Sequence, residues 1–158
     1  MSVADRIAVM NRGRVVQFDT PVAIYDRPHT LFVNGFIGTT NLLNGRLASA
    51  GDGTVTVALD CGGSLSLPVS FPGPAGDAVM LSVRPEQLAL SATPGPGLWR
   101  IEPGLSLPLG GQLVHEARTA DGTVLKIVEP RLGSSPAAPR VYCGLANDAR
   151  PSLFPRSH

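Results

Sequence analysis

Few residues of this sequence have the type and spacing that chemistry requires. A phosphate-binding loop ends in Gly-Lys-Ser/Thr, so that backbone amides and the lysine hold the phosphates, but the only lysine, Lys126, follows Leu125. His115 and Glu116 are adjacent, and adjacent side chains on a strand point to opposite faces. We interpret them as a rim histidine and a solvated glutamate. Because a Gly-x-Ser-x-Gly elbow is also missing, the sequence predicts no catalytic residues.

The stretch Arg84-Pro85-Glu86 is the candidate for a regulatory or interface site. Pro85 holds Arg84 extended and removes a ladder donor, so a strand ends here. Arg84 and Glu86 could bind an anion or contact a partner subunit, or they could form a local ion pair that fixes the strand end. Cys61 and Cys143 are interpreted as free, partly buried thiols, since no spacing resembles a zinc site. We expect no metal and no cofactor in this chain.

Charge and hydropathy narrow the class of protein. The formal net charge of the 158 residues is +1, which provides no electrostatic footprint for nucleic acid or anionic lipid. No apolar run approaches membrane-spanning length, and the N-terminus lacks a signal-peptide pattern. These features predict a cytosolic protein that reaches a membrane only through a partner.

The predicted secondary structure that must position these residues begins with a short hairpin and two short helices. β-branched residues flank the turn at Asn11-Arg12-Gly13. Thr20 can cap a helix over Val22–Arg27 with Pro21 at its first position. A second short helix is expected over Thr30–Ile37, because this stretch has one apolar face, and Gly38 is placed to end it.

From Thr39 onward the apolar residues recur with the period of two that is typical of β-strands. Alternating or apolar runs separated by Gly and Pro turns predict a small OB-like β-barrel. Loops are expected over 91–108, around Trp99, and over 133–139. The predicted strands begin at Leu42 and continue over 54–59, 64–67, 78–83, 113–117, 123–128 and 140–144. The fold class is therefore mainly β: a hairpin and two helices, then the barrel.

Several stretches resemble the ATP-binding subunits of ABC importers. Residues 4–10 (Ala-Asp-Arg-Ile-Ala-Val-Met) and 13–17 (Gly-Arg-Val-Val-Gln) resemble the last strands of their ATP-hydrolysing domain. Residues 20–28 and 32–38 look like the family's link to its C-terminal domain. Val-Arg-Pro-Glu over 83–86 resembles the hallmark of the transport-associated OB (TOBE) domain.

The resemblance implies a fragment with two parts: residues 1–38 as the end of the ATPase domain with its linker helices, and 39–158 as the TOBE domain. It implies a regulatory and assembly role, a second copy of the subunit and membrane permease subunits as partners, and ATP and Mg bound only by the parent subunit. The stretch Thr40-Asn41-Leu42-Leu43 resembles polyamine importers slightly more than the other importers of the family. The hairpin would have lost its sheet neighbours, so we expect a marginally stable N-terminal part.

One departure and two alternatives remain. Family members usually carry a Tyr-Leu-Gly hairpin after the strand that would here be Gln112–Ala117, so this barrel is expected to lack a strand or to have a remodelled edge. The alternative function is a stand-alone binder of small oxyanions. Nucleic-acid binding would need a basic groove with stacking aromatics, which one tryptophan and the low charge disfavour.

Overall fold

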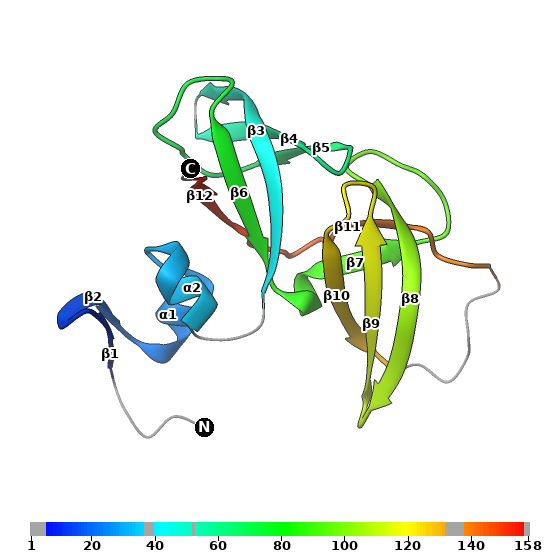
Figure 1. The fold of residues 1–158 in the computed structure, drawn as a ribbon, viewed down its shortest axis with the longest axis horizontal. Coiled ribbons are helices and arrows are strands. Elements are labelled where there is room, and N and C mark those ends of the chain that lie inside the picture. Colours follow the sequence, from blue (N-terminus) through cyan, green and yellow to red (C-terminus); the bar gives the residue numbers. More distant parts are fainter. Residues whose placement is uncertain (1–5, 37–39, 52, 132–137, 157–158) are drawn as a thin grey trace. The chain divides into compact units, whose positions relative to one another are not determined.

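The computed structural model describes residues 6–36, 40–51, 53–131 and 138–156 (Figure 1). The chain divides into two compact units, Met1–Thr40 and Asn41–His158. Predictions that involve Ala4, Asp5, Ile37, Gly38 and most of the 133–139 loop lie outside the described residues. No helix in the described ranges is long and apolar enough to cross a membrane.

The first unit is a hairpin with two short helices. It consists of β1 (Ile7–Asn11), β2 (Arg14–Asp19), α1 (Pro21–Asp26) and α2 (Leu31–Phe36). The turn works because Arg12 and Gly13 both have positive φ, 53° and 78°, the conformation that matches the twist of a two-residue hairpin. The Thr20 hydroxyl accepts a hydrogen bond from the Ala23 amide at 3.2 Å, so the predicted cap is confirmed. Val9, Ile24 and Val33 form the small core.

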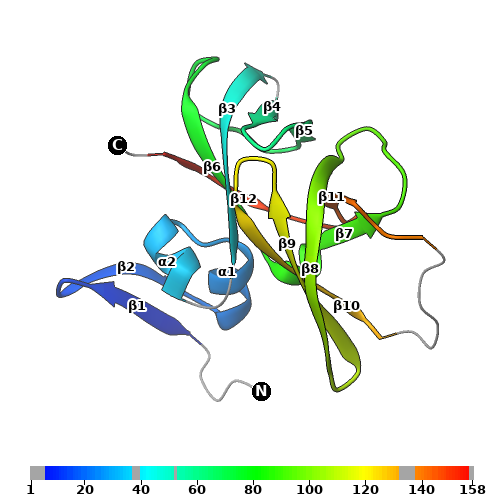
Figure 2. The same cartoon turned by 45° about the vertical axis from the view of Figure 1, so that its right-hand side comes forward.

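The second unit contains two five-stranded antiparallel sheets (Figures 1 and 2). The first sheet has the order β12-β6-β3-β4-β5 and the second has the order β10-β9-β8-β11-β7. The first is built from β3 (Asn41–Gly51), β4 (Thr54–Leu59), β5 (Ser64–Leu67), β6 (Ala78–Val83) and β12 (Ser152–Pro155). The second is built from β7 (Leu88–Ser91), β8 (Trp99–Leu109), β9 (Gln112–Thr119), β10 (Val124–Pro130) and β11 (Tyr142–Leu145). The short 3-10 helix η1 (Pro85–Gln87) joins β6 to β7.

One apolar core draws on both sheets. Val57 and Leu81 come from the first sheet and Leu125 and Ile127 from the second, and all four are buried in a single cluster. The period of two places these side chains inward: every second residue of β4 from Val55 is buried, as expected for a sheet with one covered face. Cys61 and Cys143 are free and buried, as predicted.

The prediction of a loop over 91–108 is wrong in its second half. Residues 99–109 form β8, which pairs with β9 along most of its length. Pro103, Gly104 and Pro108 hide the strand period in the sequence, and a register shift between Pro103 and Ser106 absorbs an extra residue. Strand β8 is therefore a long strand that was not predicted from the sequence. Strands β7 and β12 were not predicted either, because both are short and are held by pairing with distant strands.

Candidate functional site

The Arg84-Pro85-Glu86 stretch forms the corner between the two sheets. The Arg84 amide donates to Gln87 Oε1 at 2.9 Å, and the Gln87 amide donates to the Arg84 carbonyl at 2.9 Å. Pro85 opens η1 at a position where its missing N–H costs nothing. Arg84 is only 4% exposed and Pro85 is buried, whereas Glu86 is exposed. Of the three predicted residues, Glu86 is the one that presents its side chain to solvent.

A second polar cluster joins three strands of the second sheet. The Ser106 hydroxyl lies 2.7 Å from His115 Nδ1, and His115 Nε2 lies 2.9 Å from Glu129 Oε1. Arg140 binds the same carboxylate through both terminal nitrogens, at 2.9 Å and 2.5 Å. His115 therefore pairs with Glu129 across the sheet, while its neighbour Glu116 is exposed. The predicted solvated glutamate is confirmed, but the histidine is engaged and largely buried.

We call the four side chains of this cluster, Ser106, His115, Glu129 and Arg140, the polar clamp, because hydrogen bonds and opposite charges hold them together. Hydrogen bonds from Arg140, helped by His115, hold the pKa of Glu129 below its ordinary value, and the carboxylate in turn raises the pKa of Arg140. A serine, a histidine and a carboxylate in a row also occur in acyl-transfer enzymes, where the free carboxylate stabilises the imidazolium. Here Arg140 already neutralises Glu129, so the carboxylate has less charge to offer the ring. The arrangement instead ties β8, β9 and β10 to the segment before β11.

Sequence reasoning missed this cluster because its members are far apart in the chain. A signal was available: residues 115, 117 and 119 and residues 125, 127 and 129 each share one face of a strand by the period of two. The register of β9 against β10 sets His115 opposite Ile127 and one diagonal step from Glu129. Only that register brings the two side chains together.

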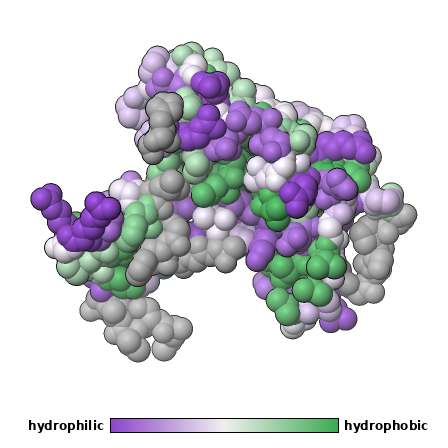
Figure 3. All heavy atoms as spheres, in the orientation of Figure 1, coloured by the Kyte–Doolittle hydropathy of each residue, from purple (hydrophilic) through white to green (hydrophobic). Residues whose placement is uncertain are grey.

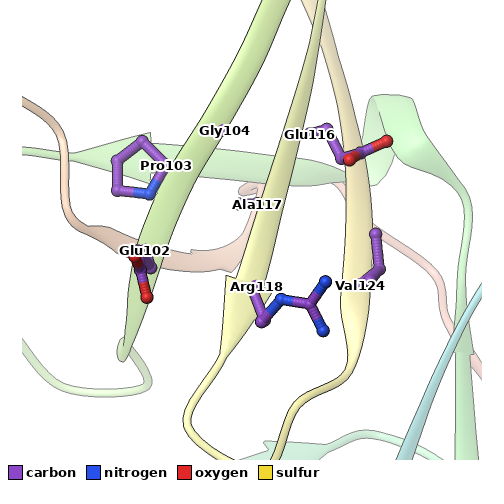
Figure 4. A pocket seen from close by; sticks show the side chains of 7 residues that line it. All are labelled: Glu102, Pro103, Gly104, Glu116, Ala117, Arg118 and Val124. Carbon is purple, nitrogen blue, oxygen red and sulfur yellow. The ribbon is translucent and has the colours of Figure 1, made fainter.

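A depression lies on the opposite, outer face of the same strands (Figure 4). It encloses about 200 Å³, and its lining includes Glu102, Pro103 and Gly104 of β8, Glu116, Ala117 and Arg118 of β9, and Val124 of β10. The hollow exists because residue 104 is a glycine: a Cβ there would come within 3.0 Å of the Glu116 carbonyl oxygen. Its lining carries charges of both signs. Among the described residues, no group of three His, Cys, Asp or Glu side chains could hold a metal ion.

Comparison with known proteins gives a consistent family. No family model matches the chain. It is 49% identical over 108 residues to the spermidine/putrescine import ATP-binding protein PotA of Frankia alni, which covers 61% of this chain and 23% of that protein. It is 40% identical over 157 residues to the sn-glycerol-3-phosphate import ATP-binding protein UgpC of Cereibacter sphaeroides, covering 94% and 40%. The chain thus spans well under half the length of these relatives.

A solved structure with a similar fold is also found. A molybdate-bound crystal structure of the cytoplasmic molybdate-binding protein ModG aligns with a TM-score of 0.58 at 14% identity, covering 73% of this chain and 96% of that one. The likeness confirms the predicted OB-like fold and, at this identity, shows the fold alone. The sequence matches carry the relationship: this chain is homologous to the C-terminal part of the ATP-binding subunits of ABC importers.

Proposed function

We propose that this chain acts as the C-terminal regulatory and assembly portion of the ATP-binding subunit of an ABC solute importer. One observation carries the proposal: the match to UgpC of Cereibacter sphaeroides extends over 94% of the chain. The similarity therefore includes both the hairpin-and-helix unit and the two-sheet unit. A shared OB-like fold alone would not predict the first unit.

The proposed division of labour follows from the residues that the chain has and lacks. ATP and Mg would be bound by the rest of such a subunit, because this sequence has no Gly-Lys-Ser/Thr loop. The chain by itself would hydrolyse no ATP and need no cofactor. Its partners would be a second copy of the subunit and the membrane permease subunits, at the cytoplasmic face of the membrane. Nucleic acid is not expected as a partner. Within the predicted 83–86 stretch, an interface role would fall to Glu86.

The transported solute is proposed to be of the polyamine type. Four of the relatives are spermidine/putrescine import proteins, among them those of Frankia alni, Acidothermus cellulolyticus and Thermobifida fusca. Relatives named for sn-glycerol 3-phosphate match at similar identity. Uptake assays with a polyamine and with sn-glycerol 3-phosphate would show which of the two is the transported solute.

A chimera tests the proposal directly. The C-terminal segment of UgpC from Cereibacter sphaeroides is replaced by this chain, and glycerol 3-phosphate uptake is measured in cells that lack their own UgpC. We expect the chimera to co-purify with the permease and to restore uptake, whereas UgpC truncated at the same point should not. A chimera that is folded, stably expressed and unable to bind the permease would contradict the proposal.

The competing function, stand-alone oxyanion binding, has a separate test. It is favoured by the fold shared with a molybdate-binding protein. Isothermal titration of the chain with molybdate and with sulfate should show no binding if the assembly role is correct. Stoichiometric molybdate binding at micromolar concentration would favour the alternative.

A further inference from the structure

The depression on the outer face of the second sheet is open because one residue of its lining has no side chain. A Cβ on Gly104 would come within 3.0 Å of the Glu116 carbonyl oxygen. Pro103 and the half-exposed Val124 add apolar surface to the lining. We call this feature the Gly104 hollow. Its volume of about 200 Å³ is below the roughly 300–1,000 Å³ of sites for drug-sized ligands, so it suits a small molecule.

The charged side chains of the Gly104 hollow do not neutralise one another. Glu102 lies in register with Arg118, yet none of the ion pairs within the described residues involves Glu102, Glu116 or Arg118. Arg118 Nη1 instead donates to the Gly122 carbonyl at 3.1 Å, and Figure 4 shows the Arg118 side chain directed toward Val124 rather than toward Glu102. Both carboxylates and the remaining guanidinium N–H groups are therefore open to a ligand.

The signs of these charges select the class of ligand. An oxyanion would meet two carboxylates against one guanidinium, and a diamine would bring two ammonium groups to a hollow that already contains Arg118. Among the described residues, the two carboxylates have no third metal-binding side chain beside them. A molecule with one ammonium and one carboxylate satisfies both signs, because carboxylates accept from an ammonium group and a guanidinium binds a carboxylate through two parallel hydrogen bonds.

The surface next to the hollow is apolar on the side of the β8–β9 turn. Leu105 directly follows Gly104 and is 70% exposed, and apolar side chains gather where β8 and β9 end (Figure 3). A ligand whose charged groups occupy the hollow can therefore place an aliphatic side chain against Pro103 and Leu105. Contact between such apolar groups removes both from water and favours binding.

We propose that the Gly104 hollow binds a free α-amino acid with an aliphatic side chain. Glu102 and Glu116 would hold its ammonium group, and Arg118 would hold its carboxylate. These three side chains are exposed, so water and salt screen each contact. We therefore expect a dissociation constant in the millimolar range that rises with ionic strength. The site goes beyond the proposed transport function and does not depend on it.

Amide chemical shifts of the full isotope-labelled chain test the ligand class. The probes are L-leucine, isoamylamine, which is leucine without the carboxylate, and isocaproate, which is leucine without the ammonium group. We expect L-leucine to shift the amides of Gly104, Ala117 and Arg118 in a saturable way, and the other two probes to bind about tenfold or more weakly. Isoamylamine that binds as well as L-leucine would show a simple cation site and would overturn the inference.

Substitutions test the position of the site. Gly104→Ala adds a methyl group to the hollow and should abolish the response to L-leucine. Gly111→Ala, where a built Cβ meets nothing within 4 Å, should leave the response unchanged. Arg118→Gln should raise the dissociation constant about tenfold. Because the Arg118 side chain is exposed, this variant should keep the wild-type circular dichroism, so the test holds even if Gly104→Ala does not fold.

Two results would overturn the inference: no saturable shift with L-leucine, or binding that persists in both Gly104→Ala and Arg118→Gln. Either result alongside a transporting chimera leaves the proposed function intact. Saturable binding of L-leucine with an inactive chimera overturns that function alone.

Discussion

Glu129 is the residue on which the polar clamp of the second sheet depends. Its carboxylate binds both Arg140 and His115, and Arg140 lowers its pKa. A lowered folded-state pKa stabilises the protein above the unfolded pKa of about 4.3, and this contribution is lost as the pH falls through the folded value. We expect Glu129→Gln to lower the free energy of unfolding by about 1 kcal/mol at pH 7. Urea titrations at several pH values measure the difference.

The control for this prediction is Glu116→Gln, which changes an exposed carboxylate on the same strand pair. It should have little effect at any pH. The difference between wild type and Glu129→Gln should begin to shrink as the pH falls below about 4.3, where the carboxylate of the unfolded chain takes up a proton, and should be lost once the pH has fallen through the lower folded pKa. A difference that stays constant down to the acid transition would contradict the assignment of the charge to the clamp.

Asn41 connects the two sheets through its side chain. Its Nδ2 donates to the Lys126 carbonyl at 2.8 Å, and its Oδ1 accepts from the Lys126 amide at 2.8 Å, at a position 4% exposed. Aspartate cannot donate, and it would set a carboxylate against a carbonyl oxygen. We expect Asn41→Asp to lower the free energy of unfolding by about 2–3 kcal/mol, measured by urea denaturation. Asn147→Asp, at an exposed turn, should be neutral, and equal effects of the two changes would contradict this role.

At the scale of elements, β3 is the strand whose close approach to its neighbour needs a glycine. A Cβ on Gly45 would come within 2.7 Å of the Ala58 carbonyl oxygen and 2.9 Å of Val57 Cγ1. Because backbone cannot move aside easily, Gly45→Ala should cost about 1–3 kcal/mol. Gly51 ends the same strand with nothing within 4 Å of a built Cβ, so Gly51→Ala should be neutral or slightly stabilising. Thermal unfolding of both variants checks the pair, and equal losses would show that the packing argument is wrong.

The strands differ in how far the sequence predicts them. The alternation of β4 and the long apolar run of β6 are local signals, and both strands lie where the sequence predicted them. Strand β8 has no such signal, because two prolines, a glycine and a register shift break its period. Pairing with β9 makes it a strand, which is a tertiary effect that overrides local preference.

At the scale of the whole molecule, the two units differ in core size. The first unit buries Val9, Ile24 and Val33, whereas the second shares one large core between its sheets. A small core supports little stability of its own. In hydrogen exchange, the amides of β1 and β2 should therefore exchange much faster than those of Val79–Val83. Equal protection of the two regions would contradict the expected marginal stability of the first unit.

The sequence alone determined the family, the mainly β class, the capped first helix and the lack of a phosphate-binding loop. All of these depend on local sequence motifs, on the local periodicity of apolar residues or on the presence of a residue type. The tertiary structure alone decided that β12 joins the first sheet, that Asn41 binds across to β10 and that His115 meets Glu129 and Arg140. These contacts join residues far apart in the chain. The register of paired strands sets them, and no local pattern encodes that register.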